Sequence, residues 1–348
     1  MIRPRLRSRK RSGSRADATR TAAAAVNSWA TSCPPCNDAA MAAPHLIYET
    51  VHGSRAYGLD REGSDTDVKG VVIGPAAWYA GFRGGPEQVD LSPDHVRYDI
   101  RKLFRLAAAG NPTVLEVLWT DPADHVVVTD LGRRLLEHRN AFLSKRIAER
   151  FSAYARGQLR RIETHRSWLR DPPAIAPTRA AFALPEHTGL PADQLAAAAR
   201  HLDTNDPAAA DLSATVLDVL HRERRYKAAQ DRWTQFRSWE RGRNPARAAL
   251  ERAHGYDTKH AMHLIRLQRM AVEVLQTGEL TIRRADRDDL LAIRDGALAY
   301  PELLEMSELL HAQTEAAATT SSLPDDPDDD ALDELCTELV LARLGGAS

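Results

Sequence analysis

Two kinds of hydrophobic pattern divide this 348-residue chain into a part with short strands and helices and a part made of helices. Short stretches in which apolar residues alternate with polar ones, or follow one another between glycines, predict strands. These stretches are residues 46–51, 68–73 and 95–100. Helices are predicted over residues 101–109 and 113–119, separated by the breaker Gly110–Pro112. Interspersed strands and helices predict an α+β fold class for this part.

The pattern changes at about residue 130, beyond which most apolar residues recur at helical spacing. Helices are predicted over residues 145–170, 212–240, 257–276, 286–294 and 301–316. The stretch 171–211 is rich in Pro and Ala, and we interpret it as a linker or irregular insertion. We therefore predict a small mixed-sheet domain over residues 41–140, followed by an all-helical domain over residues 141–316.

Both ends of the chain have the composition of solvated segments. The first 15 residues carry seven basic side chains and no acidic one, and residues 1–40 show no apolar periodicity. We expect a disordered basic arm there, with Met41 as the alternative start and a transit peptide as a third interpretation. The segment Pro324–Glu334 has seven acidic residues and no basic one, which predicts a solvated, disordered run. Residues 317–348 are thus interpreted as an acidic tail with a short helix.

The composition narrows the class of protein without identifying it. Hydrophobic residues make up 43% of the chain and charged residues 27%, as in soluble globular proteins, and no run of 18 apolar residues predicts a membrane span. The 47 basic and 48 acidic residues nearly balance, so net charge does not indicate a nucleic-acid binder. Three cysteines without further ligands at zinc-site spacing favour a reducing, cytoplasmic location.

The polar residues after the first predicted strand have the chemistry of a phosphate and metal site. Gly53 and Ser54 can present backbone N–H groups and a hydroxyl to phosphate oxygens. Asp65 and Asp67 are two positions apart, so on extended backbone their carboxylates point to the same side. Two such charges about 4 Å apart repel by about 4 kcal/mol at an effective dielectric constant of 20. A divalent cation relieves that repulsion, and oxygen-only ligands favour Mg²⁺.

A third carboxylate is expected on a neighbouring strand, as in two-metal phosphoryl-transfer sites. Within residues 95–100 the polar positions alternate with apolar ones, which assigns Asp99 to the polar face where Asp65 and Asp67 are expected. Asp94 is the alternative third ligand. Asp99 also directly precedes a predicted helix, the position of an N-cap.

These motifs resemble those of a known superfamily. Gly53-Ser54, ten intervening residues and then Asp65-Thr66-Asp67-Val68 resemble the signature of the polymerase-β-like nucleotidyltransferases, although Thr66 stands where that superfamily usually has a hydrophobic residue. The segments Tyr98–Glu116 and Tyr256–Leu267 are similar to a bacterial and phage branch of predicted nucleotidyltransferases linked to RNA repair. The resemblance covers roughly residues 45–316. Glu116 itself is expected to form a local salt bridge.

The resemblance implies a reaction and a role for each motif. Gly53 and Ser54 would hold the β- and γ-phosphates of a nucleoside triphosphate. The acids Asp65, Asp67 and Asp99 would bind two Mg²⁺ ions, with Mn²⁺ as an alternative. An acceptor hydroxyl would attack the α-phosphate in line, and pyrophosphate would leave. On the predicted helix 257–276, Lys259 is a candidate triphosphate contact, and His260 and His263 are candidates to lie near the acceptor.

The predicted helix 145–170 gives the best indication of the acceptor. Its apolar stripe is formed by Ile147, Phe151, Tyr154, Ile162 and Leu169. Its other face carries eight basic residues against Glu149 and Glu163, a net charge of +6, which suits a polyanion such as an RNA end. Candidate contacts are Arg156, Arg160 and Arg161. The alternatives are a protein or small-molecule acceptor, and a non-catalytic, antitoxin-like module that binds the triphosphate; the intact acids favour the enzyme.

Overall fold

The computed structural model describes residues 43–187 and 214–345, which form two compact units. The described part of the smaller unit comprises residues 43–45 and 74–85 and contains helix α1 (Ala76–Ala80). In it the Gly74 amide donates to the Tyr79 hydroxyl over 2.9 Å. All other helices and nearly all strand residues belong to the larger unit. The predicted basic arm 1–40 and most of the predicted insertion lie outside the described residues.

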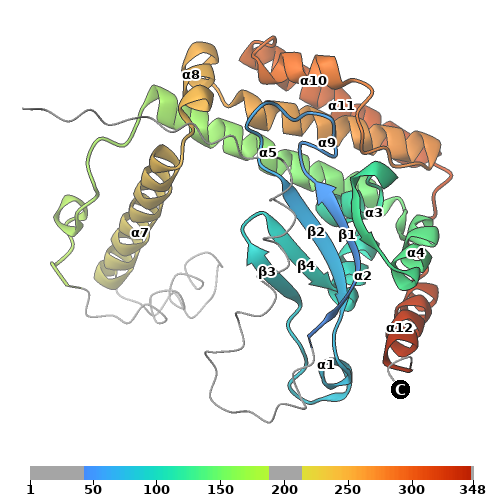
Figure 1. Cartoon of the computed structure of the whole chain (residues 1–348). Helices are drawn as coiled ribbons and strands as arrows, with labels where there is room; N and C mark the ends of the chain where they lie inside the picture. The colour runs from blue at the N-terminus through green and yellow to red at the C-terminus, as the bar shows by residue number, and fades with distance from the viewer. Residues whose placement is uncertain (1–42, 188–213, 346–348) are drawn as a thin grey trace, which may run out of the picture. The chain divides into compact units, whose positions relative to one another are not determined.

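A five-stranded mixed sheet forms the N-terminal part of the larger unit (Figure 1). The strands are β1 (His45–His52), β2 (Asp67–Ile73), β3 (Gln88–Ser92), β4 (His95–Asp99) and β5 (His125–Val128), in the order β3-β4-β2-β1-β5. β2 and β4 are parallel, whereas β3 pairs with β4 and β5 pairs with β1 in antiparallel fashion. The predicted mixed sheet is thus confirmed. The edge strands β3 and β5 were not predicted, because they are only five and four residues long and β5 is a run of valines without alternation.

Helices α2 (Ile100–Ala108), α3 (Pro112–Leu118) and α4 (Asp130–Glu137) accompany the sheet. Tyr48 of β1 is fully buried, and its hydroxyl donates to the Val117 carbonyl of α3 over 3.0 Å. Gly110 has a φ of 72° and lets the chain turn between α2 and α3. The Asn111 side chain then accepts from the Val114 amide and caps α3. Residues Gly110–Pro112 therefore separate the two helices, as predicted.

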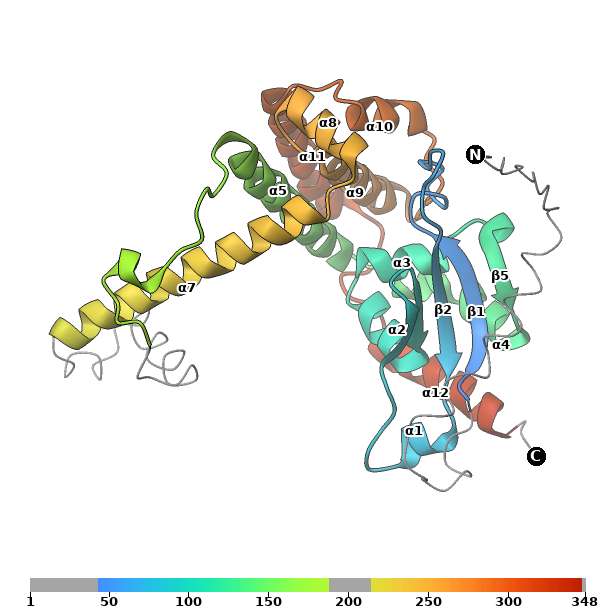
Figure 2. The ribbon, with the colours of Figure 1, turned by 60° about the vertical axis from the view of Figure 1, so that its left-hand side comes forward.

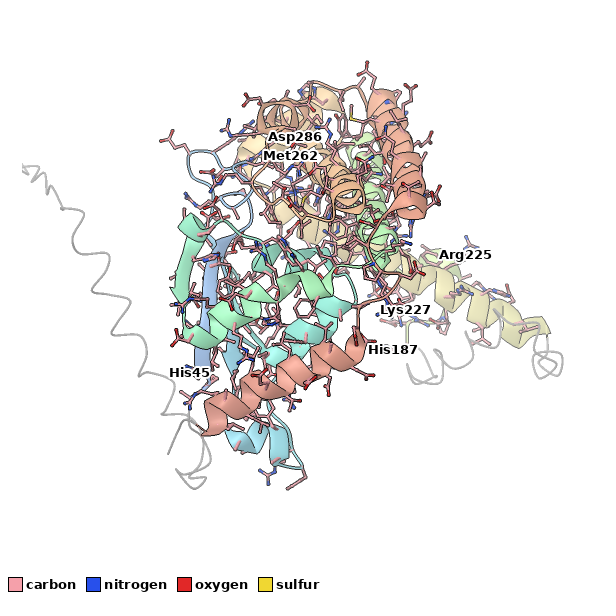
Figure 3. The ribbon with its side chains drawn as sticks, turned by 90° about the vertical axis from the view of Figure 1, so that its right-hand side faces the viewer. His45, His187, Arg225, Lys227, Met262 and Asp286 are labelled. Carbon is pink, nitrogen blue, oxygen red and sulfur yellow. The ribbon has the colours of Figure 1, made fainter. Side chains whose placement is uncertain are left out.

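The remaining chain is helical. In the described residues its helices before the C-terminal segment are α5 (Arg146–Arg170), α7 (Ala214–Arg241), α8 (Pro245–His254), α9 (Thr258–Thr277), α10 (Arg287–Arg294) and α11 (Tyr300–Thr320). Short 3₁₀ turns are η3 (Pro122–Asp124), η4 (Arg139–Phe142) and η5 (Arg179–Phe182). Helix α9 packs against α5, α10 and α11 (Figure 2), and Met262 lies buried among these helices (Figure 3). Gly278 ends α9 with a φ of 74°. The order of a mixed sheet followed by helices confirms the predicted α+β fold class.

The acidic C-terminal segment is ordered, and the prediction of a disordered run is wrong. Helix α12 (Asp329–Gly345) packs against α2 and α4. Its buried side chains are Leu332, Leu335, Cys336, Leu339 and Val340. The seven acids obscure this apolar face in the sequence, because they occupy the exposed positions between and before these residues. Burial of the apolar face supplies the ordering free energy that a solvated acidic run lacks.

One position on α5 also differs from its prediction. Ile147, Phe151 and Ile162 are fully buried as expected, but Tyr154 is 39% exposed. The helical spacing places Tyr154 at the margin of the apolar stripe, where an aromatic ring with a hydroxyl can face a solvent-filled pocket. Among the described residues, no helix combines the length and hydrophobicity needed to cross a bilayer.

Candidate active site

The chain leaves β1 in a tight turn that contains the Gly-Ser motif. The Tyr57 amide donates to the Gly53 carbonyl over 3.1 Å, and the Leu59 amide donates to the Ser54 carbonyl over 2.8 Å. Gly53 has a φ of 70°, and a Cβ atom built there would lie 2.1 Å from Oδ2 of Asp67. The absence of a side chain at Gly53 therefore lets the Asp67 carboxylate lie directly against the turn.

The two acids of the motif lie beside this turn. Asp67 is the first residue of β2 and is half-buried, whereas Asp65 is exposed in the preceding loop. Partial burial of the Lys259 ammonium group lowers its pKa, as do Arg247 and Arg294, while the negative charge of Asp65 acts in the opposite direction. The structure thus brings the Gly-Ser turn, both acids and Lys259 of α9 into one region, as the motifs predict.

The sheet register excludes Asp99 from that region. Val68 and His95 are partners across β2 and β4, and so are Val72 and Asp99, so Asp67 is level with Asp94. Asp99 lies five positions further along, about 16 Å away at 3.3 Å per residue. An odd offset also places it on the opposite face. The prediction of Asp99 as a third metal ligand is wrong, because alternation within one strand does not reveal its alignment with the next.

Asp99 has a structural role instead. Its buried carboxylate accepts from the Arg101 amide over 3.1 Å and from Nε of Arg101 over 3.0 Å, which caps α2. Asp94, the alternative third carboxylate, lies at the same end of the sheet as Asp67, and its carbonyl accepts from the Val68 amide over 2.7 Å.

The polar face of β4 meets an acid of β1 rather than the motif acids. His95 Nε2 and Arg97 Nε both lie 2.8 Å from Oε1 of the buried Glu49. Arg97 reaches Glu49 across Gly70 of the intervening strand β2, where a Cβ atom would lie 3.1 Å from Arg97 Cγ. This ion pair stabilises the sheet on the face away from Asp67.

A buried ion pair lies under the Gly-Ser turn, and the sequence reasoning missed it. Glu116 of α3 accepts from the Tyr57 hydroxyl over 2.5 Å and from Nη1 of Arg266 on α9 over 2.6 Å. The Arg266 guanidinium lies 3.8 Å from the centroid of the Tyr57 ring. Burial raises the pKa of Tyr57 well above its ordinary value, so the hydroxyl stays a donor. The prediction of a local salt bridge at Glu116 is wrong, since its partner lies 150 residues away.

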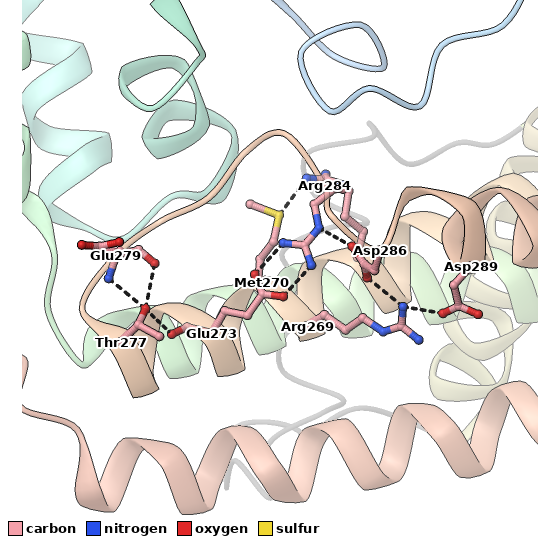
Figure 4. A network of polar contacts seen from close by, with 9 residues as sticks. Arg269, Met270, Glu273, Thr277, Glu279, Arg284, Asp286 and Asp289 are labelled. Atoms are coloured by element: carbon pink, nitrogen blue, oxygen red, sulfur yellow. Dashed lines mark hydrogen bonds and ion pairs between the residues drawn. The ribbon is translucent and has the colours of Figure 1, made fainter.

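The segment before α10 and α10 itself hold the same turn from outside. The Arg284 amide donates to the Tyr57 carbonyl over 3.1 Å, Arg287 Nε to the Gly58 carbonyl over 2.6 Å, and Arg294 Nη1 to the Leu59 carbonyl over 3.1 Å. Figure 4 shows the polar network that fixes this segment. In it Arg284 binds Glu273 and Asp286, and Arg269 binds Asp286 and Asp289.

A cationic pocket of about 310 Å³ lies between the sheet domain and the helices, next to the turn. Its lining comes from the end of β1 and the turn, from α3, and from the helices α5, α8 and α9. The residues are His52, Tyr57, Pro112, Thr113, Glu116, Tyr154, Gln158, Arg161, Arg247, Lys259, His260, His263, Arg266 and Leu267. Of the residues singled out from the sequence, Arg161, Lys259, His260 and His263 line this pocket.

The two histidines of α9 are neutral at physiological pH. Burial lowers the pKa of His263 well below its ordinary value, and the nearby Arg266 and Lys259 lower it further. Burial also lowers the pKa of His260 to about 4, although Asp257 opposes the shift. Neutral imidazoles give the cationic pocket hydrogen-bonding nitrogens without adding charge.

A second group of potential metal ligands lies beside this pocket. Within the described part of the chain, His165, Asp257 and His260 place one ligand atom each within 4.8 Å of one another. Asp257 Oδ2 lies 3.0 Å from His165 Nδ1 and also binds Nη2 of Arg247, while Oδ1 accepts from the His260 amide and caps α9. Because a guanidinium already occupies the shared oxygen, this trio fits an ion-pair network better than a metal site.

The basic face predicted on α5 is only partly available. Lys145 Nζ pairs with Asp325 over 2.8 Å and Arg146 Nε with Asp326 over 2.5 Å, both in the segment that leads to α12. Arg156 and Arg160 are exposed but do not line the cationic pocket, whereas Arg161 does. Of the three predicted contacts, the structure brings only Arg161 to the site.

Comparison with known proteins finds a similarity for the N-terminal part of the chain. Residues 36–172, somewhat less than half of the chain, match the family described as RlaP, RNA repair pathway DNA polymerase beta family. The match contains all five strands, the Gly-Ser turn, both motif acids and the whole of α5. No curated protein and no solved structure is significantly similar to the chain.

Proposed function

We propose that the chain, whose residues 36–172 match the RNA repair pathway DNA polymerase beta family, is a Mg²⁺-dependent nucleotidyltransferase. It transfers a nucleoside monophosphate from a nucleoside triphosphate to a hydroxyl at an RNA end and releases pyrophosphate. The observation that carries this proposal is the direct packing of the Asp67 carboxylate against the Gly53 backbone, with Asp65 two residues away. This arrangement places the phosphate-binding turn Gly53–Ser54 next to the carboxylates of Asp65 and Asp67, and we call these four residues the triphosphate cradle.

The residues at the turn fit a divalent ion held between them and a triphosphate. Asp65 and Asp67 offer carboxylate oxygens, and Asp94 is the third carboxylate that the sheet register keeps at this end of the sheet. When bound, Mg²⁺ supplies charge neutralisation for the phosphates and the attacking oxygen. Gly53 and Ser54 bind the outer phosphates through backbone amides and the Ser54 hydroxyl. Lys259 orients the triphosphate by its positive charge.

The charge around the turn supports a polyanionic acceptor. Arg161, Arg247, Lys259 and Arg266 line the cationic pocket; Arg247 and Arg266 are paired with Asp257 and Glu116, which leaves the charges of Arg161 and Lys259. A protein or small-molecule acceptor lacks the repeated negative charge that such a pocket attracts. RNA is therefore the first acceptor to test.

The test is incubation with each α-³²P-labelled nucleoside triphosphate and Mg²⁺, with and without cellular RNA. We expect label in RNA with the wild type and with Asp99→Asn, because Asn keeps the helix cap. The Asp65→Asn/Asp67→Asn double variant should transfer at most about one-hundredth as much, since each exchange removes a charge at nearly constant volume.

Each other outcome has a distinct meaning. Label in the protein itself would indicate protein nucleotidylation. Metal-dependent triphosphate binding without transfer to RNA, protein or small molecules would favour the non-catalytic module. Loss of activity in Asp99→Asn with an unchanged melting temperature would restore Asp99 to the site and contradict the register argument.

A further inference from the structure

We propose that the cationic pocket binds the terminal nucleotide of a single-stranded acceptor RNA, with Arg161 and Lys259 as ligands of its phosphate and Tyr154 as the stacking surface for its base. The inference rests on the proposed function and assigns the substrate of the same site. Four observations carry it: the separation of the pocket from the triphosphate cradle, its unbalanced charge, its open hydrogen-bonding atoms and its exposed ring.

The cationic pocket is distinct from the triphosphate cradle. None of Gly53, Ser54, Asp65 and Asp67 is among its lining residues. Lys259 belongs to both regions, because it lines the pocket and also interacts electrostatically with Asp65. A ligand in the pocket thus lies beside the carboxylates without occupying the place of the triphosphate, which is the position that a second substrate needs.

The charge of the pocket is not balanced from within. Among the described residues, neither Arg161 nor Lys259 has a carboxylate within 4 Å, whereas Arg266 is neutralised by Glu116 and Arg247 by Asp257. Two unpaired cations on opposite helices, α5 and α9, lack a counter-charge that a phosphate would provide.

Open hydrogen-bonding atoms accompany these cations. His260 Nδ1 and His52 Nε2 are both buried and have no hydrogen-bond partner in the described part of the chain. Both residues line the pocket. A buried polar atom without a partner carries a desolvation cost that a bound polar ligand relieves, and hydroxyl and base edges of a nucleotide supply such partners.

Tyr154 provides the one ring among the pocket's described lining residues that is more than one-third exposed. Asn111 Nδ2 donates to its hydroxyl over 2.7 Å, which holds the side chain. Tyr154, Gln158 and Arg161 follow one another at i, i+4 and i+7 along α5 and so form one line on the pocket wall. Proteins that bind single-stranded nucleic acids combine basic groups with aromatic rings on which bases stack, and this line of residues offers both.

The size of the pocket suits one nucleotide rather than a longer stretch of a strand. A volume of about 310 Å³ lies at the lower limit for small-ligand sites and suits one nucleotide. A nucleotide within a strand must keep two backbone exits, whereas a terminal nucleotide needs one.

The experiment measures RNA binding without triphosphate or Mg²⁺. A 12-nucleotide single-stranded RNA labelled at its 5′ end is titrated by fluorescence anisotropy, with its unlabelled linear and circular forms as competitors. We expect the circular form to compete at least tenfold more weakly. Arg161→Gln and Tyr154→Ala should each weaken binding at least fivefold. The control Arg252→Gln, an exposed arginine of the neighbouring α8 that does not line the pocket, should bind as the wild type does.

Two results would overturn the inference: equal competition by the linear and circular RNA, or wild-type affinity in both pocket variants. Displacement of the RNA by Mg²⁺ and a non-transferable α,β-methylene triphosphate would also overturn it, by showing that the pocket is part of the triphosphate site. The Asp65→Asn/Asp67→Asn variant should bind RNA at least as tightly as the wild type, because it removes negative charge near Lys259. End-specific binding without any nucleotidyl transfer would therefore contradict the proposed function and leave the pocket assignment intact.

Discussion

At the scale of single residues, the site depends on an atom that is missing from Gly53. The Asp67 carboxylate fills the space where a Cβ atom would stand, and the positive φ of Gly53 disfavours any other residue. Both effects fix glycine at this position for physical reasons, one steric and one conformational. They can be separated because Gly63 shares the positive φ but has no atom within 4 Å of a built Cβ.

We expect Gly53→Ala to abolish nucleotidyl transfer, because the new methyl group must displace the Asp67 carboxylate. It should also lower the free energy of unfolding by about 1–2 kcal/mol through left-handed strain. The control Gly63→Ala should show the strain alone and keep its activity. Transfer assays and denaturant unfolding of both variants provide the check. Full activity in Gly53→Ala would contradict the claim that transfer needs the Asp67 carboxylate packed against Gly53.

The buried pair Glu116–Arg266 acts at the same scale but joins the two halves of the chain. Arg266→Met should lower the free energy of unfolding by about 3–5 kcal/mol, because it leaves the Glu116 carboxylate buried without its ion-pair partner. The double variant Glu116→Gln/Arg266→Met should lose less than the single one, since no charge remains unpaired. Urea unfolding measures both, and a larger loss in the double variant would argue against this explanation.

At the scale of elements, α12 shows how an apolar face overrides an acidic composition. Leu339 is 1% exposed on the face that packs against the sheet domain, whereas Leu341 on the same helix is 61% exposed. The two leucines differ only in the side of the helix that they occupy. Their substitution therefore tests whether the C-terminal helix belongs to the core of the protein.

Leu339→Ala should lower the free energy of unfolding by about 2–5 kcal/mol, the range for a buried leucine that leaves a cavity. Leu341→Ala should change it by less than about 0.5 kcal/mol. Thermal or urea unfolding of the full chain distinguishes the two. Equal, small effects would mean that α12 contributes nothing to the fold in solution.

At the scale of the whole molecule, the buried neutral histidines couple folding to pH. His260 has a pKa of about 4 in the folded chain, and a solvated histidine has one near 6.5. Between these values the unfolded chain binds a proton that the folded chain does not, so stability rises with pH across this window. Burial lowers the pKa values of His52 and His263 as well, which acts in the same direction.

We therefore expect the free energy of unfolding to fall as the pH is lowered from about 6.5 to about 4, by about 3 kcal/mol for His260 alone. His260→Gln should show a smaller fall. His311→Gln, in which an exposed histidine is exchanged, should retain the wild-type pH dependence. Urea unfolding at pH 7 and pH 5 tests this, and an identical slope in His260→Gln and the wild type would contradict it.

Local features of this protein were predictable because neighbouring residues decide them. The strand β1, the Gly-Ser turn, the caps at Asn111 and Gly278 and the helix α9 each follow from a few consecutive residues. The motif acids and Lys259 were likewise recognisable as candidates from their spacing. The edge strands β3 and β5 were not recognised, because four or five residues give too short a pattern.

The sequence by itself determined the α+β class and the motif of Gly53, Ser54, Asp65 and Asp67. It also predicted a domain boundary near residue 140. Only the tertiary structure decided which other acids lie at the same end of the sheet. The parallel register of β2 and β4 removes Asp99 and keeps Asp94, and it depends on backbone pairing between strands 20 residues or more apart. Glu116 and Arg266 meet across 150 residues. Such pairings are set by packing of whole elements, and no local pattern records them.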